Sequence, residues 1–203
     1  MIPGEKASLR SADKKADVGM MSLAASGYKS AQRQIVDRLL NRVRSTALYL
    51  AGGHQDAEDY AQMAIIEILK SAGSYRGEST LESWAQKITV RTVMRQIKKR
   101  RWRGQFMVVS QEYEGTTDDS AEMELSRRRA LQRVALLFGD LKPGVRAVMT
   151  MKLVHGYSIV EIAQMLDTNE HNVRYRLRVG RQKLRRRLKN DPVLREWIGE
   201  ERQ

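Results

Sequence analysis

Residues 158–188 constrain the fold more than any other stretch, because their pattern predicts two helices joined by a tight turn. The apolar residues of the first helix recur at helical spacing: Ile159, Ile162, Ala163 and Leu166. Ser158 is a candidate N-cap, and Glu161 follows it at the spacing of a capping box. Asp167 and Thr168 then interrupt the apolar pattern, and Asn169 can cap the helix that follows. This order describes a helix-turn-helix.

The second of these helices has one narrow apolar seam and is basic on every other face. The seam consists of Val173, Leu177, Gly180, Leu184 and Leu188. The basic residues are Arg174, Arg176, Arg178, Arg181, Lys183, Arg185, Arg186, Arg187 and Lys189, and no acidic residue occurs between His171 and Lys189. Because like charges repel one another unless a polyanion neutralises them, the pattern favours a helix that enters the major groove of DNA. The alternative is an amphipathic helix hairpin with a solvated basic face.

The composition of the whole chain also favours a nucleic-acid partner. The 203 residues carry a formal net charge of +13, and such an excess indicates a polyanionic partner. An anionic membrane surface is the other candidate, but the sequence has no membrane-spanning apolar run, signal-peptide core or lipidation motif. Since there is no cysteine, disulfides and thiolate zinc sites are excluded. We expect an intracellular, mostly helical protein without a metal or a cofactor.

The first half of the chain predicts an extension followed by helices. Residues 1–27 have no sustained period and predict a flexible N-terminal extension, for which disorder without a function is an equal alternative. A helix begins near Lys29 and ends at Ala51-Gly52-Gly53. Asp56 is the candidate N-cap of the next helix, whose first turn carries Glu58 and Asp59, where the helix dipole favours anions. Capping explains these acids, so His54 beside them does not predict a metal site.

A loop rich in Gly and Ser at residues 71–80 leads into a long basic helix that ends near Arg103. Its basic residues at spacings of four, four and three share one face: Lys87, Arg91, Arg95 and Lys98. Three aromatic residues lie in or just before the basic run: Tyr75, Trp84 and Trp102. Cations beside aromatic rings suit unstacked bases. Core packing is the alternative for Trp84.

The charge then reverses in residues 104–126, which we interpret as an acidic linker. Its acids are Glu112, Glu114, Asp118, Asp119, Glu122 and Glu124. The linker is either a solvated spacer or a segment that mimics nucleic acid in a channel. Residues 127–190 predict a four-helix unit that ends in the helix-turn-helix, with Pro143 near a helix start. Residues 191–203 form a tail that either docks as a short helix around Trp197 or frays. The expected fold class is therefore all-α, with two small helical domains joined by a flexible acidic linker.

The order of these features resembles the sigma-70 family, specifically the two-domain extracytoplasmic-function (ECF) sigma factors, over about Lys29 to Leu188. The segment 56–62 resembles region 2.2, residues 75–79 with Trp84 resemble region 2.3, and residues 87–103 resemble region 2.4. Four short motifs resemble region 4: Leu141-Lys142-Pro143, Gly156-Tyr157-Ser158, Glu161-Ile162-Ala163 and Val173-Arg174 with Arg176-Leu177. The resemblance implies region 2 at residues 28–103 and region 4 at residues 127–190.

The resemblance also implies roles for individual residues. Those expected to bind core RNA polymerase at the β′ clamp helices are Asp56, Glu58, Asp59 and Gln62. Those expected at the promoter −10 element are Tyr75, Arg76, Trp84, Lys87, Arg91, Arg95 and Lys98. Those expected at the −35 element are Glu170, His171, Asn172, Arg174, Tyr175, Arg178, Arg181, Lys183, Arg185 and Arg186.

Four positions depart from the family pattern. Met63 stands where an acid is usual, and Arg91 where many members have Asn. Asp167 replaces the usual turn Gly, which implies a left-handed backbone at a residue that tolerates it less well than Gly. Gly180 replaces a common Ala, at a cost of roughly 0.5–1 kcal/mol of helix stability.

We therefore expect a bacterial, cytoplasmic initiation factor that is not an enzyme. It would bind core RNA polymerase through the β′ clamp helices and the β flap, bind promoter DNA, and be held by an anti-sigma partner. A stand-alone helix-turn-helix regulator is the first alternative, but it would need a dimer interface and leaves the basic helix 87–103 unexplained. A nucleic-acid-processing enzyme is the second, and no cluster of catalytic groups supports it.

Overall fold

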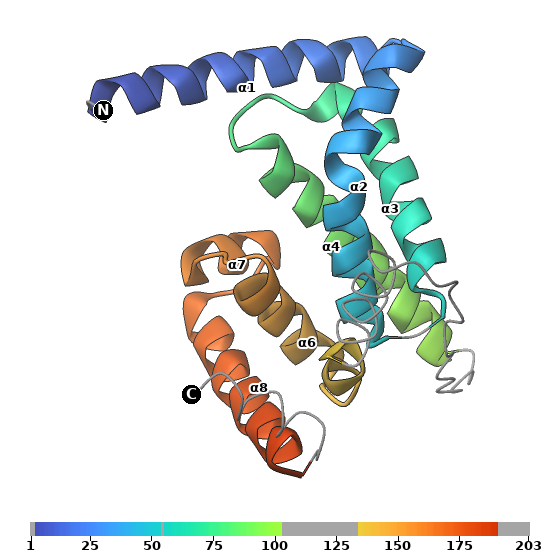
Figure 1. The fold of residues 1–203 in the computed structure, drawn as a ribbon, viewed down its shortest axis with the longest axis vertical. Coiled ribbons are helices and arrows are strands. Elements are labelled where there is room, and N and C mark those ends of the chain that lie inside the picture. Colours follow the sequence, from blue (N-terminus) through green and yellow to red (C-terminus); the bar gives the residue numbers. More distant parts are fainter. Residues whose placement is uncertain (1–2, 54, 103–133, 191–203) are drawn as a thin grey trace, which may run out of the picture. The chain divides into compact units, whose positions relative to one another are not determined.

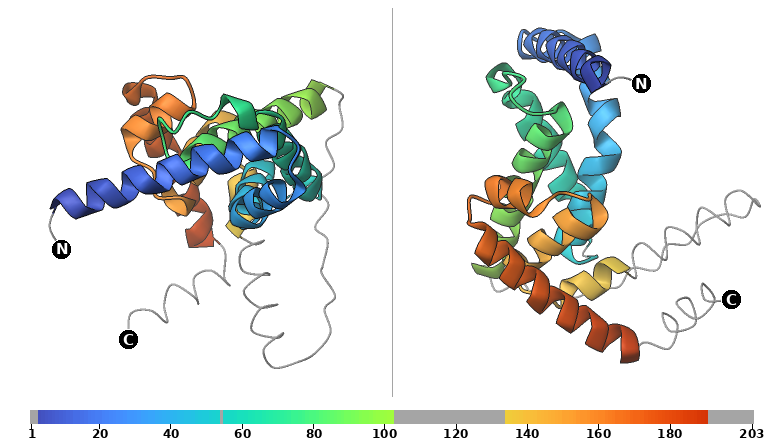
Figure 2. Two further views of the ribbon diagram at one scale, coloured as in Figure 1. Left: turned by 90° about the horizontal axis from the view of Figure 1, so that it is seen from above. Right: turned by 90° about the vertical axis from the view of Figure 1, so that its left-hand side faces the viewer.

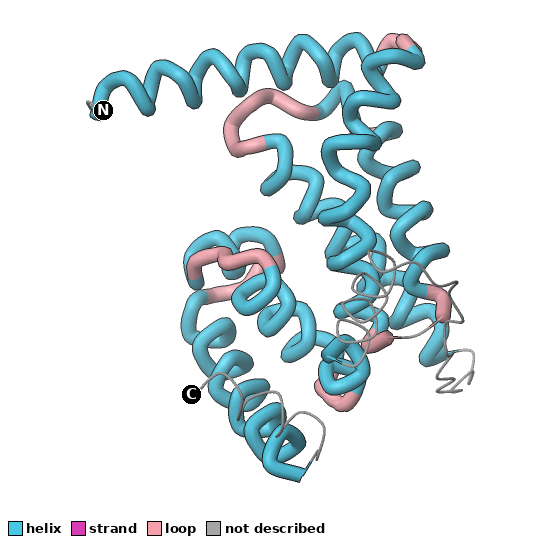
Figure 3. Tube along the Cα trace, in the orientation of Figure 1, coloured by secondary structure: helices cyan, strands magenta, loops and turns pink. Residues whose placement is uncertain are grey.

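The computed structural model describes residues 3–53, 55–102 and 134–190. Over these residues every regular element is a helix, which confirms the expected all-α class (Figure 3). The chain divides into two compact units, one of Met1–Ala47 with Asp56–Gln105 and the other of Leu48–Gln55 with Phe106–Gln203. The expected acidic linker and the Trp197 tail lie outside the described residues.

The first unit contains α1 (Pro3–Ala25), most of α2 (Lys29–Ala51), α3 (Ala57–Lys70), the short 3-10 helix η1 (Ala72–Ser74) and α4 (Leu81–Trp102) (Figure 1). Helix α3 packs along α4 (Figure 2). The core takes one face from each helix: Met21, Ile35, Leu39, Val43, Ile68, Leu81, Val90 and Val93. One polar pair is included in this core, where the Gln86 side-chain amide donates to the Thr46 hydroxyl at 2.9 Å and leaves neither group unsatisfied.

Glycines end the first two helices. At the end of α1, Gly27 has φ +91°, and the amide of Tyr28 donates to the carbonyl of Leu23, which is the pattern of a Schellman motif. At the end of α2, Gly52 has φ +70°, and the amide of Gly53 donates to the carbonyl of Leu48 in the same way. The predicted end of the helix at Ala51-Gly52-Gly53 is thus confirmed.

Helix α1 lies where the sequence predicts a flexible extension, so that expectation is wrong for this stretch. Asp17, Met21 and Ala24 recur at helical spacing and are all buried, although one of them is charged and one is small. The apolar pattern is too sparse to predict a helix without knowledge of the surface that it covers. The carboxylate of Asp17 is buried because it pairs with Arg38 of α2.

The second unit contains helical residues 134–139, α6 (Pro143–Met149), a π-helical turn η2 (Thr150–Val154), α7 (Ile159–Met165) and α8 (Glu170–Asn190). Helices α6 and α7 both pack on α8. The buried residues include Val148, Met149, Met151, Ile162, Val173 and Leu177. Pro143 stands in the first turn of α6, as predicted, where its missing amide hydrogen removes no helical hydrogen bond.

Candidate nucleic-acid interface

Local side-chain caps fix where the two helices of the helix-turn-helix begin, and both predicted caps, Ser158 and Asn169, are present. The amide of Glu161 donates to the Ser158 hydroxyl at 3.2 Å, and the Glu161 carboxylate accepts from the Ser158 amide at 2.8 Å. These hydrogen bonds from Ser158 lower the pKa of Glu161. Asn169 caps α8, because its side-chain oxygen accepts from the amide of Asn172 at 2.8 Å. Asp167 has φ +50°, the left-handed conformation expected for it.

The seam of α8 fixes which face of the helix turns outward. Val173, Leu177 and Gly180 are buried and Leu184 is half-buried. A methyl group at Gly180 would lie 2.5 Å from the buried side chain of Met149, so the glycine permits α8 to approach α6 closely. The seam therefore turns most of the remaining surface of α8 toward solvent.

Nine of the −35 candidates on α8 are exposed, namely His171, Asn172, Arg174, Tyr175, Arg178, Arg181, Lys183, Arg185 and Arg186. The tenth, Glu170, is half-buried and accepts from Arg174 at 2.8 Å, one helical turn away. The guanidinium of Arg178 lies over the ring of Tyr175, 5.6 Å from its centre. Arg174 and Arg178 are thus each held by a neighbour on the same helix.

Two further arginines of α8 contact residues outside this helix. Arg176 is half-buried, and its guanidinium lies against Gly144 at the start of α6. Arg187 is exposed and pairs with Asp140 at 2.9 Å. Neither residue is among the −35 candidates, and both contact other parts of the second unit.

The basic face of α4 has the geometry that its spacing predicts. Arg91, Arg95 and Lys98 are exposed and Lys87 is half-buried. The opposite face is buried in the core through Val90 and Val93. The four cations therefore lie on one solvent-facing surface and can contact successive phosphates of a strand.

The loop at residues 71–80 differs from its expected form in one residue. Tyr75 is buried, and its hydroxyl donates to the carbonyl of Ser79 at 2.9 Å. Its ring meets Trp84 edge-on, with 5.4 Å between the ring centres. Trp84 is half-buried, whereas Arg76 is exposed. The buried Tyr75 side chain thus supports the loop from its inner side. Arg76 and Trp84 remain accessible to a base.

The expected polymerase face on α3 is partly engaged within the unit. Asp56 makes no side-chain cap to α3, contrary to its expected role; its carboxylate accepts from the Tyr60 hydroxyl at 3.1 Å and pairs with Arg100 at 3.2 Å. Glu58 pairs with Arg44 of α2 at 2.7 Å. Asp59 and Gln62 are exposed.

Two further side chains on α3 extend this face. Met63 is 43% exposed and Ile66 is 51% exposed, next to Asp59 and Gln62 along the helix. Sequence reasoning missed Ile66. The pair Ile65-Ile66 contained a signal, because adjacent side chains on an amphipathic helix point in different directions and one of the two tends to lie nearer the solvent. The exposed surface of α3 is therefore apolar as well as acidic.

Within the described residues no group of three or more acidic or histidine side chains could hold a metal ion. His54, the histidine weighed as a ligand, lies outside them. Over the same part of the chain no helix is both long enough and apolar enough to span a membrane.

Comparison with known proteins assigns a family to this arrangement. Residues 35–103 match the family model of sigma-70 region 2, and residues 131–184 match the model of sigma-70 region 4. The chain is 30% identical over 156 residues to the ECF RNA polymerase sigma factor SigE of Mycolicibacterium smegmatis, which covers 75% of this chain and 59% of SigE. It is 25% identical over 176 residues to SigM of Mycobacterium tuberculosis, which covers 86% of this chain and 85% of SigM.

The fold is also that of a solved structure, CnrH in complex with the cytosolic domain of CnrY. The TM-score is 0.62 at 23% identity, over 87% of this chain and 99% of CnrH. Regions 2 and 4 of the sigma-70 family together define a factor that directs transcription initiation by RNA polymerase. The chain belongs to the sigma-70 family of RNA polymerase sigma factors, and within that family to the ECF group.

Proposed function

We propose that this sigma factor contacts the −10 element through α4 and the 71–80 loop, and the −35 element through α8. The observation that carries the proposal is that each unit exposes a cationic face which its own apolar core orients: Arg91 and Arg95 on α4, and Arg174 and Arg178 on α8. Sigma factors are initiation factors rather than enzymes, so these faces bind DNA and perform no reaction on it.

At the −10 element we infer that Arg76 and Trp84 receive unstacked bases. Arg91, Arg95 and Lys98 then neutralise the phosphates of the same strand, with Lys87 nearer the core. Extruding a base from the duplex costs a few kcal/mol, which stacking and phosphate contacts offset. Tyr75 acts by holding the loop, because it is buried beneath it.

At the −35 element we infer that the exposed residues in the first two turns of α8 reach base edges. Arg174 is the first candidate for a guanine, because arginine can bind the two acceptors of guanine at once. The residues farther along α8 bind phosphate: Arg181, Lys183, Arg185 and Arg186.

Core RNA polymerase is the protein partner that family membership assigns to this chain. We propose that α3 docks on the clamp helices of the β′ subunit through Asp59, Gln62 and the exposed Met63 and Ile66. Asp56 and Glu58 contribute less directly, since both are paired inside the unit. We further propose that region 4 meets the β flap and that the protein works in the cytoplasm, where polymerase acts.

We also propose an anti-sigma partner. The support is the structural neighbour CnrH, which was solved in complex with the cytosolic domain of CnrY.

The proposed function is tested by reconstitution. The purified chain is mixed with bacterial core polymerase, and complex formation is measured together with run-off transcription from a library of genomic fragments. We expect a stable holoenzyme and a limited set of start sites that share a −10 and a −35 sequence. A chain that does not join core polymerase, or a holoenzyme that opens no fragment, contradicts the proposal. A dimer that binds a palindrome without polymerase would favour the stand-alone regulator instead.

A further inference from the structure

Helix α1 runs along the 71–80 loop and touches it at three points. At the end of α1 a methyl group on Gly73 would lie 3.5 Å from the Cβ of Ala25. Farther along, a methyl group on Gly77 would lie 3.0 Å from Val18 and 3.9 Å from the Cβ of Lys14. The Lys14 ammonium also lies 3.4 Å from the carbonyl of Glu78. The loop is therefore bordered by α1 over several helical turns (Figure 1).

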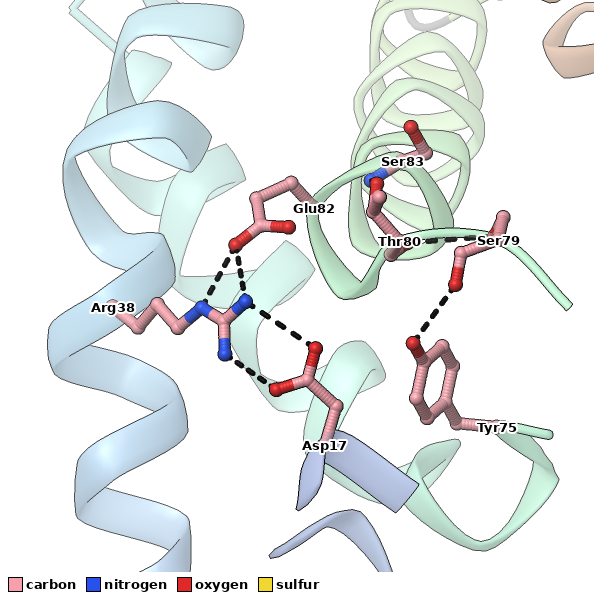
Figure 4. Close-up of polar contacts among 7 residues, drawn as sticks. All are labelled: Asp17, Arg38, Tyr75, Ser79, Thr80, Glu82 and Ser83. Atoms are coloured by element: carbon pink, nitrogen blue, oxygen red, sulfur yellow. Dashed lines mark hydrogen bonds and ion pairs between the residues drawn. The ribbon is translucent and has the colours of Figure 1, made fainter. Parts of the chain in front are cut away.

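One ion network fastens α1 in this position. Arg38 of α2 binds Asp17 of α1 through two nitrogens, at 2.5 and 3.3 Å, and binds Glu82 in the first turn of α4 at 2.7 Å (Figure 4). Asp17 is buried, with 9% of its side chain exposed, so its charge depends on this partner. The pKa of Arg38 is raised: burial acts to lower it, but the hydrogen bonds to Asp17 and Glu82 outweigh that effect.

The network also lies next to the base of the loop. Burial raises the pKa of Tyr75, and the carboxylates of Asp17 and Glu82 raise it further. Tyr75 is the residue whose hydroxyl holds the carbonyl of Ser79, and Glu82 follows the loop directly on α4. A movement of Arg38 would thus reach the end of the loop through Glu82 at the start of α4, and a change of charge at Asp17 would be felt electrostatically at Tyr75 in the middle of the loop.

We propose that α1 is a positioning element for the 71–80 loop and that Asp17, acting through Arg38 and Glu82, sets how selectively the loop captures −10 bases. This inference rests on the proposed role of the loop at the −10 element. The physical reason is preorganisation: a loop held in one shape loses less conformational entropy on binding and rejects a wrong base more strongly. Asp17 itself touches no DNA in this account.

The first test is the isosteric substitution Asp17→Asn, which removes the charge and keeps the volume. The matched control is Asp13→Asn, one helical turn earlier on α1, where the aspartate is exposed and outside the network. Each variant is assembled into holoenzyme, and its affinity is measured for single strands with the matched −10 sequence and with one base changed. Core binding and −35 duplex binding are measured alongside.

We expect Asp17→Asn to lower the ratio of matched to mismatched −10 affinity by about threefold to tenfold, while core and −35 binding stay unchanged. Asp13→Asn should keep the wild-type ratio. An unchanged ratio in Asp17→Asn overturns the proposal. An equal loss in core, −35 and −10 binding also overturns it, because a general loss of fold gives that result.

The second test uses the absence of native cysteine. Cβ atoms at positions 14 and 77 would be 3.9 Å apart, within the roughly 3.5–4.5 Å of a disulfide. The oxidised form of the double variant Lys14→Cys, Gly77→Cys is compared with its reduced form. Gly77 has φ +71°, so any backbone strain from the substitution there is the same in both forms. We expect the oxidised holoenzyme to keep at least the −10 selectivity of the reduced one. Loss of −10 binding on oxidation means that α1 must leave the loop, and this overturns a positioning role.

A wrong role for the loop and a wrong role for α1 give different results. If wild-type holoenzyme binds no −10 strand at all, the proposed function of the loop is wrong. If wild type discriminates between strands and Asp17→Asn discriminates equally well, only the role of α1 is wrong.

Discussion

Gly180 shows how a single residue can decide the spacing of two helices. It lies inside α8, where glycine is unfavourable, yet its hydrogen faces the buried side chains of Met149 and Val145 on α6. A Cβ there would approach Met149 to 2.5 Å and Val145 to 3.1 Å. The cost of glycine in the helix is thus offset by a close helix contact, and the position of α8 in the unit depends on it.

We predict that Gly180→Ala destabilises the protein although alanine is the better helix former. The gain in helix propensity is about 0.5–1 kcal/mol and the cost of overpacking about 1–3 kcal/mol, so the net loss should be about 1 kcal/mol. The measurement is chemical denaturation of the full chain. Gly19→Ala is the matched control, because Gly19 lies within α1 with open space around its Cα, and we expect it to be neutral or stabilising. A Gly180→Ala variant as stable as wild type would show that Met149 repacks without cost.

The capping box predicts a pH dependence. The pKa of Glu161 is lowered from its ordinary value of 4.5 by its hydrogen bonds with Ser158, so the ionised carboxylate is favoured in the folded state. A group with a lowered pKa stabilises the fold above its unfolded value and loses that contribution as the pH falls through the folded value. Ser158→Ala should cost about 1 kcal/mol at neutral pH. Denaturation at several pH values should show this difference shrinking below about pH 4.5, the unfolded value of Glu161. A difference that is constant with pH would remove Glu161 from the effect.

The residues that sequence reasoning located correctly are those whose structure is decided nearby in the chain. The caps Ser158 and Asn169 and the left-handed Asp167 depend on a few neighbours, so the pattern alone predicts them. The ion-pair partners of Asp56 and Asp17 are on other helices, and no local pattern contains Arg100 or Arg38. Tyr75 lies in the predicted loop, but its burial depends in part on a ring contact with Trp84 of α4 that no local pattern contains.

Among the elements, α8 combines two kinds of DNA contact on one helix. Arg174 near its start is held by Glu170, whereas Arg186 near its end is exposed and outside any described ion pair. Binding to a base edge discriminates between sequences, and binding to a phosphate does not. The two arginines should therefore respond differently to substitution although they carry the same charge.

We predict that Arg174→Ala lowers discrimination between matched and altered −35 sequences by about 1–3 kcal/mol. Arg186→Ala is the comparison: it should weaken binding to all sequences alike and reduce the slope of log affinity against log salt by about one. Both are measured as holoenzyme affinity for promoter DNA at several salt concentrations. Equal losses on matched and altered sequences for Arg174→Ala would identify Arg174 as a phosphate contact, and an unchanged salt slope for Arg186→Ala would remove that residue from the interface.

At the scale of elements, the sequence predicts a helix well where its apolar stripe is continuous, as in α2 and α8. It fails for α1, whose buried face consists of Asp17, Met21 and Ala24 and carries little hydrophobic signal. The helix is stabilised by a surface that belongs to α2 and to the 71–80 loop, and that surface exists only after the unit has folded.

For the whole molecule, the net charge of +13 is unevenly distributed along the sequence. The basic stretches lie in α4 and α8, while residues 104–126 between them contain acidic residues and no basic ones. Such a segment has two possible uses in a DNA-binding protein. It can keep two cationic units apart, or it can occupy a nucleic-acid channel of the polymerase until the transcript displaces it. Only the second use depends on the acids during early RNA synthesis.

We predict that replacing the six acids of this segment by their amides changes the yield of abortive transcripts while promoter binding is unchanged. The acids are Glu112, Glu114, Asp118, Asp119, Glu122 and Glu124. A uniform negative charge mimics a nucleic-acid backbone only in its electrostatics, so the order of the residues should matter little. The control is therefore a variant with the same linker composition in scrambled order, which should give the wild-type yield in abortive initiation assays with holoenzyme. If the amide variant and the scrambled variant both match wild type, the segment is a spacer, and its charge has no role in early RNA synthesis.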